Sequence, residues 1–101
     1  MDAWTALGDP TRRAIFERLG DRPQAVVELA RELPVSRPAV SQHLKVLKAA
    51  RLVTDRPAGT RRIYRLDPRG VGVLRADLER YWHQPLTAYK AIVEQATEED
   101  P

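Results

Sequence analysis

The sequence predicts a mainly helical domain that carries one small β-hairpin. Three segments between residues 10 and 49 repeat apolar side chains at the spacing of a helix, and prolines, glycines or capping residues bound each of them. Two runs rich in β-branched and aromatic residues then flank a turn that contains Pro57 and Gly59. A chain of 101 residues supports one core, so we expect a single domain over residues 1–96 and an acidic tail over 97–101.

The first strong helix is expected to begin at Pro10. Asp9 can cap it, and proline suits the first helical position because the N–H there has no partner within the helix. One face of this helix is apolar and carries Ala14, Ile15 and Leu19. The turn residues over 20–23 follow, so we expect the helix to end near Leu19.

Two more helices are expected on either side of a short turn. The first covers residues 26–32 and ends before Pro34, which cannot continue a helix. Ser36 then caps a helix over residues 37–49. The inward positions of that second helix are apolar: Val40, Leu44 and Leu47. Two short helices joined in this way predict a helix-turn-helix.

A β-hairpin and a long helix complete the chain. We expect strands over residues 52–54 and 62–66, joined by an arginine-rich turn over residues 55–61. Asp67 and Pro68 repeat the pattern that starts a helix, and the apolar periodicity beyond them predicts a helix of about 25 residues or more.

Several classes of protein are excluded by what the sequence lacks. It contains no cysteine, which removes disulfides, thiolate metal sites and cysteine nucleophiles. No apolar run approaches the length of a membrane span, and the first residues do not resemble an export signal, so we expect a cytoplasmic protein with no membrane partner. No Gly-x-Ser-x-Gly elbow accompanies its serines and histidines, so we expect no enzyme activity.

Basic residues are concentrated in the second half of the predicted helix-turn-helix and in the hairpin. Between Arg37 and Arg69 there are nine lysines or arginines and only two acids, whereas the remainder of the chain has eight basic and twelve acidic residues. A cluster of positive charge on a helix-turn-helix indicates a polyanionic partner, and double-stranded DNA fits best.

The second helix of a helix-turn-helix enters the major groove with its N-terminal half. Arginines of the hairpin would then lie against the backbone or an adjacent minor groove. The candidate DNA contacts are therefore Ser36, Arg37, Pro38, Ser41, Gln42, His43 and Lys45 on the helix, and Arg56, Thr60, Arg61, Arg62 and Tyr64 on the hairpin.

Apolar residues near both termini predict a homodimer. Together they form a larger apolar patch than a monomer usually exposes, and a two-fold contact between two copies would bury it. The candidate interface residues are Trp4, Leu7, Leu74, Leu78, Tyr81, Trp82, Leu86, Tyr89, Ile92 and Val93. Their aromatic members could instead line a pocket for a small molecule.

Three segments resemble one family. The run from Ser36 to Val53 (SRPAVSQHLKVLKAARLV) is similar to the recognition helix and wing entry of the ArsR family of winged helix-turn-helix repressors. Residues 9–13 with Leu19 resemble that family's second helix, and residues 59–64 resemble its wing. The resemblance extends from Trp4 to Val93. It implies a dimer interface formed by the first and last helices, and a dimer that represses transcription by occupying an operator.

The chain departs from the metal-sensing members of that family. They carry a Cys-Val-Cys motif on the helix before the turn, where this chain has residues 25–29 without a thiol. The positions aligned with a second known site, on the last helix, are Tyr81, His83, Glu94 and Thr97. Because only two of these are common metal ligands, we expect no metal and no cofactor.

Two alternatives to a simple repressor stay open. The scaffold could serve as a sensor of a metal or a small molecule, since an apolar effector pocket near the dimer helices leaves little trace in a sequence. It could also be a winged-helix module that docks protein, although the basic helix and hairpin favour DNA.

Overall fold

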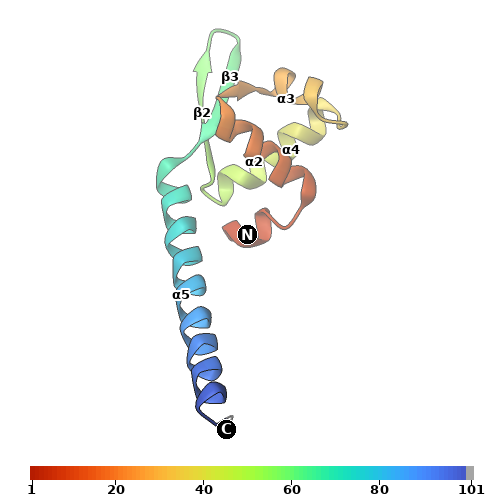
Figure 1. Ribbon diagram of the computed structural model, residues 1–101. Coiled ribbons are helices and arrows are strands. Elements are labelled where there is room, and N and C mark those ends of the chain that lie inside the picture. Colours follow the sequence, from red (N-terminus) through yellow and green to blue (C-terminus); the bar gives the residue numbers. More distant parts are fainter. Residues whose placement is uncertain (100–101) are drawn as a thin grey trace.

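The computed structural model describes the backbone of residues 1–99 and the side chains of residues 1–83 and 90–96. Figure 1 shows a compact head and a long last helix, α5 (Pro68–Glu99), that projects away from it. The molecule measures 71 × 27 × 23 Å, with a radius of gyration of 19.0 Å. A compact domain of this length would have a radius of gyration of about 13 Å. The projecting helix accounts for the difference.

The head consists of four helices and three strands. In chain order they are α1 (Ala3–Ala6), α2 (Pro10–Asp21), β1 (Gln24–Ala25), α3 (Val26–Glu32), α4 (Arg37–Ala49), β2 (Val53–Ala58) and β3 (Arg61–Leu66). The predicted mainly helical class is confirmed, and so are the predicted bounds of α3 and α4. The predicted caps form as well, since Asp9 Oδ2 accepts the N–H of Arg12 at 2.9 Å and Ser36 Oγ accepts that of Ala39 at 3.3 Å.

The core lies where α2, α3 and α4 meet. Its buried apolar side chains are Ala6, Ile15, Leu19, Leu29, Val40, Leu44, Leu47, Leu52 and Val53. The short α1 is fixed to α2 by two arginines: Arg12 Nε donates to the carbonyl of Ala6 at 2.7 Å and Arg13 Nε to that of Leu7 at 3.2 Å. These bonds place Trp4 beside α5.

The hairpin is part of a three-stranded antiparallel sheet in the order β1–β3–β2. Strand β1, which pairs Gln24 with Tyr64 and Ala25 with Ile63, was not predicted from the sequence. The predicted turn over residues 55–61 was wrong, because the strands continue to Ala58 and resume at Arg61. Pro57 is tolerated because β2 is an edge strand.

The actual turn contains only Gly59 and Thr60. Gly59 has a φ of +66°, and Thr60 is not among the residues with positive φ, which is the pattern of a type II′ turn. We call the unit formed by β2, this turn and β3 the wing.

The junction between α4 and the wing fixes where α5 begins. Arg51 adopts a left-handed conformation with a φ of 62°, and the N–H groups of Arg51 and Leu52 bond back to the carbonyls of Lys48 and Leu47, both at 3.0 Å. This is the Schellman arrangement that ends a helix. The backbone of Gly70 lies directly against it, so that a Cβ at Gly70 would fall 1.5 Å from the Arg51 carbonyl oxygen. Only glycine fits there.

Helix α5 continues through residues 97–99 of the predicted acidic tail, and residues 100–101 lie outside the described residues. Across the described residues, no helix combines the length and the apolar character that crossing a membrane requires.

Candidate nucleic-acid interface

The outer face of α4 is polar and exposed along its N-terminal half. Six of the seven candidate contacts on this helix are exposed, namely Ser36, Arg37, Pro38, Ser41, Gln42 and Lys45. On the opposite face Val40, Leu44 and Leu47 are completely buried. Because that apolar face packs into the core, the polar face of α4 must point toward solvent.

His43, the seventh candidate on α4, is half-buried and lies close to the start of α2. The pKa of Asp9 is lowered mainly because the backbone N–H of Arg12 donates to its carboxylate, and the charges of Arg12 and His43 add smaller contributions. His43 therefore lies toward the α2 cap rather than on the exposed face.

The wing carries the other candidate contacts in two different environments. Arg56 and Thr60 are exposed, and Tyr64 is half-buried. Arg61 is exposed but reaches back to α3, where its Nη2 lies 3.5 Å from Glu28 Oε1. The same Glu28 oxygen accepts the N–H of Ala25 at 3.2 Å, so the carboxylate serves both the start of α3 and the wing.

Arg62 belongs to an ion-pair network that was not predicted from the sequence. Asp55, whose side chain is only 6% exposed, lies 2.7 Å from Lys48 Nζ and 2.6 Å from Arg62 Nε. Hydrogen bonds from Lys48 and then Arg62 lower the pKa of Asp55, and the same pairing raises the pKa of Arg62. The network joins the end of α4 to both strands of the wing. The available signal was the alternation of β2, which places Asp55 on the same face as buried Val53.

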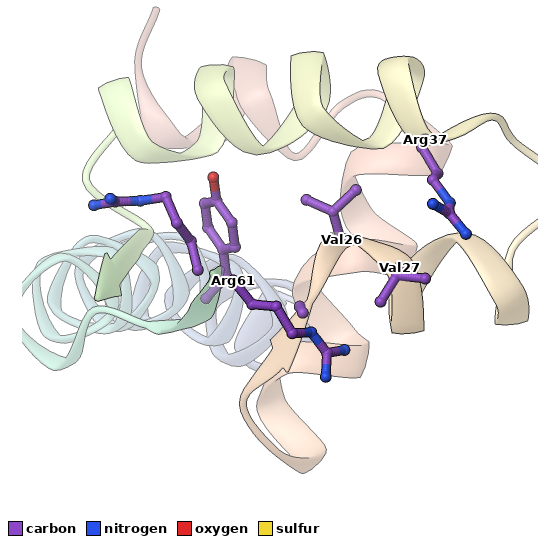
Figure 2. A pocket seen from close by; sticks show the side chains of 7 residues that line it. Val26, Val27, Arg37 and Arg61 are labelled. Atoms are coloured by element: carbon purple, nitrogen blue, oxygen red, sulfur yellow. The ribbon is translucent and has the colours of Figure 1, made fainter. Parts of the chain in front are cut away.

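A cavity brings α3, α4 and the wing together on one side of the head. Its lining, which we call the arginine cavity, consists of Ala25, Val26, Val27, Arg37, Arg61, Arg62 and Tyr64. Figure 2 shows Val26 and Val27 between Arg37, which extends from the start of α4, and Arg61, which extends from the wing. The first residue of α4 and the arginines of the wing therefore face the same space.

A second surface is apolar and lies along α5 and α1. Trp4, Leu78, Tyr81, Trp82, Ile92 and Val93 are exposed, and Leu7 and Leu74 are half-buried. The rings of Trp4 and Tyr81 meet edge to face with centroids 6.3 Å apart, which connects α1 to α5. The predicted interface residues Leu86 and Tyr89 lie outside the described side chains. We call the described set the terminal apolar surface.

The positions aligned with a family metal site all fall on α5. Tyr81, His83 and Glu94 are exposed on α5, and Thr97 lies outside the described side chains. Across residues 1–83 and 90–96, no group of three or more histidines, aspartates and glutamates could hold a metal ion.

Comparison with curated proteins finds regulators of transcription. A family model described as a helix-turn-helix domain matches residues 7–56. The HTH-type transcriptional regulator Rv2034 of Mycobacterium tuberculosis is 67% identical over 92 residues, which cover 91% of this chain and 86% of that protein. The transcriptional repressor SmtB of the same species is 48% identical over 61 residues, covering 60% of this chain and 45% of SmtB.

Solved structures agree with this comparison. A crystal structure described as a possible transcriptional regulator for arsenical resistance matches with a TM-score of 0.77 and 43% identity, covering 90% of this chain and 95% of that one. The homodimeric winged helix-turn-helix DNA-binding domain of Mb0332 from Mycobacterium bovis, described as a possible ArsR-family regulator, matches with a TM-score of 0.65 and 29% identity, covering 79% and 74%.

Proposed function

The chain belongs to the ArsR family of winged helix-turn-helix, DNA-binding transcriptional regulators, and from that premise we propose that it is a repressor. Two copies bind one inverted-repeat operator, and the bound dimer blocks transcription. The family consists of regulators rather than enzymes. Because its target is DNA, we place its action in the cytoplasm.

The observation that carries this proposal is the arginine cavity. Arg37 opens the recognition helix, Arg61 belongs to the wing, and both line the same space. A duplex laid across this side of the head would meet the exposed face of α4 and the wing together. A concentration of arginines on one face favours contact with the phosphates of DNA.

The residues of this surface have different tasks. Ser41 and Gln42 lie on the exposed face of α4, and their hydrogen-bonding groups can read the edges of bases in the major groove. Arg56, Thr60 and Arg61 on the wing contact the backbone, which supplies affinity without sequence preference. Arg62 contributes mainly through Asp55, by holding the wing at a fixed angle to α4.

Dimerisation follows from the terminal apolar surface. Its aromatic residues are exposed in a single chain, and the Mb0332 domain of the same fold is homodimeric. A two-fold dimer places two recognition helices in successive major grooves about 34–36 Å apart, which requires an inverted repeat in the DNA. Both termini, rather than the head, therefore determine the spacing of the half-sites.

Selection of bound duplexes from a random DNA pool at a stated salt concentration tests this function. We expect enrichment of an inverted repeat. Replacing Gln42 with Ala should weaken binding to that repeat by about 1–3 kcal/mol and relax its sequence preference, whereas Arg61→Gln should weaken all duplexes similarly and reduce the salt dependence. A Gln42 variant with unchanged preference would remove that residue from base recognition.

Sedimentation tests the dimer separately. Trp82→Glu places a charge in the terminal apolar surface, so we expect monomers and poor operator binding while circular dichroism still reports a folded helical head. A dimer that persists in this variant would exclude Trp82 from the interface.

A further inference from the structure

The arginine cavity has a lining that phosphate contact alone does not require. Ala25, Val26 and Val27 give it an apolar wall, the ring of Tyr64 adds an aromatic surface, and three arginines stand around it. Its volume is about 280 Å³, which is room for a small organic molecule. An apolar wall beneath a cationic rim is complementary to an anion with a hydrophobic body.

The charges around the cavity are only partly balanced. Arg62 is held by Asp55 at 2.6 Å, and Arg61 lies 3.5 Å from Glu28. Arg37 makes no ion pair or side-chain hydrogen bond with any residue in the described part of the chain. One arginine is therefore available for an incoming anion, and a second is held loosely enough to join it.

We propose that the arginine cavity binds a small amphiphilic organic anion, a carboxylate carrying a short apolar chain or ring. Its carboxylate pairs with Arg37 and Arg61, and its apolar body lies against Val26, Val27 and Tyr64. The ligand takes the arginines that DNA would use, so it competes with DNA and releases the operator. That second step rests on the proposed function, whereas binding of the anion does not.

If the anion and DNA compete for the same arginines, the effector site lies on the DNA-binding face itself. A ligand on the terminal apolar surface would have to alter the distance between recognition helices in order to release DNA. A ligand in the arginine cavity needs no change of shape, because the two partners cannot occupy the same arginines. The ligand would reduce the amount of protein free to bind DNA and would leave the geometry of the dimer unchanged.

Hexanoate is a suitable probe, measured against acetate and hexan-1-ol at equal ionic strength. Without DNA, we expect hexanoate to raise the midpoint of thermal unfolding and to shift the amide resonances of residues 25–27, 37 and 61, while acetate and hexanol do neither. Val27→Gln replaces a short apolar side chain with a longer polar one and so removes part of the apolar wall. Arg37→Gln removes the anion's first partner. Both should lose the hexanoate response, and the control Arg69→Gln, outside the cavity, should keep it.

With DNA, hexanoate at about ten times its own dissociation constant should raise the dissociation constant for a short duplex about eleven-fold. Val27→Gln should bind DNA normally and resist hexanoate. The proposal is overturned if acetate acts as strongly as hexanoate, if the two cavity variants respond like the control, or if hexanoate and DNA bind together. If the protein bound no DNA at all, the proposed function would fail, and the measurements without DNA would still decide whether the cavity takes an anion.

Discussion

The head and the outer part of α5 contain apolar residues at the same helical spacing but differ in what covers them. In α4, Leu44 and Leu47 are 0% exposed, whereas in α5 Leu78 is 50% exposed and Trp82 65%. From Leu78 onward every described side chain of α5 is exposed. Apolar periodicity therefore identifies a helix face that must be buried. It does not show whether the same chain or a second one buries it.

The boundary between the two regions lies in the first turns of α5. Leu74 is still half-buried and packs against the core of the head, and Gly70 rests on the backbone of Arg51. Beyond them Tyr81 touches only Trp4 among the aromatic rings of the described residues. The start of α5 is thus fixed by the head, whereas the described side chains of its outer part are exposed.

The largest effect should come from a cavity in the covered region. Leu44→Ala removes a fully buried side chain and should lower the free energy of unfolding by about 2–5 kcal/mol at every protein concentration. The matched variant Leu78→Ala should cost less, and its cost should depend on protein concentration because the proposed dimer would cover that residue. Urea unfolding at two concentrations measures both. Equal, concentration-independent losses would contradict the distinction between the two regions.

The second-largest loss of stability should come from a substitution at the boundary between the head and the outer part of α5. Gly70→Ala places a Cβ 1.5 Å from the Arg51 carbonyl oxygen, so α5 must shift, and we expect a loss of about 2–3 kcal/mol in thermal unfolding. Gly72→Ala is the control, because a Cβ there meets no atom within 4 Å. In a helix interior that change should stabilise by up to about 1 kcal/mol. A Gly70 variant as stable as the Gly72 variant would show that the contact with Arg51 is dispensable.

A smaller effect should follow from the Asp55 network. Asp55→Asn removes a carboxylate bound by Lys48 and Arg62, and because both cations are half exposed to solvent we expect a loss of only about 1–2 kcal/mol at neutral pH. The pKa of Asp55 is lowered in the folded protein, so its stabilisation is fully present above the ordinary carboxyl pKa of about 3.9 and is lost as the pH falls from there through the lower pKa of the folded state.

Unfolding measured from pH 7 down to pH 3 should therefore show the wild type and the Asp55 variant converging in acid. A difference that stays constant over this range would mean that the side chain acts through packing rather than charge. Because the network joins α4 to the wing, the same variant should also bind DNA more weakly without altered base preference.

Much of the helical fold could be predicted because its signals are local. Asp9 and Ser36 cap the helices that they were expected to cap, and prolines lie where the helices begin. The two-residue strand β1 was missed since nothing in Gln24 and Ala25 reveals a strand; only pairing with Tyr64 and Ile63 creates it. Pro57 suggested a turn because proline is excluded from central strands, and the sequence does not reveal that β2 lies at the edge of the sheet.

The exposed residues of the candidate site could be predicted from the sequence, but the ion pairs of its arginines could not. The helical period alone places Pro38, Gln42 and Lys45 opposite the core. The partners of Arg61 and Arg62 depend on contacts between distant segments, because Glu28 is 33 residues from Arg61 in the chain. Two arginines that look equivalent in the sequence are therefore different in the structure: Arg62 is fixed by Asp55, and Arg61 is held weakly by Glu28.

The smallest effect tests that difference between the two arginines. Glu28→Gln keeps an oxygen that can accept the Ala25 N–H, but it removes the negative charge beside Arg61. Because an exposed ion pair contributes about 0.2–1 kcal/mol, DNA binding should become roughly 1.5- to 5-fold tighter and more dependent on salt. Glu79→Gln is the matched control, since Glu79 also lies 3.5 Å from an arginine, Arg75, but on α5. If both variants bound DNA with the same affinity, Glu28 would not restrain Arg61, and the carboxylate would serve only the start of α3.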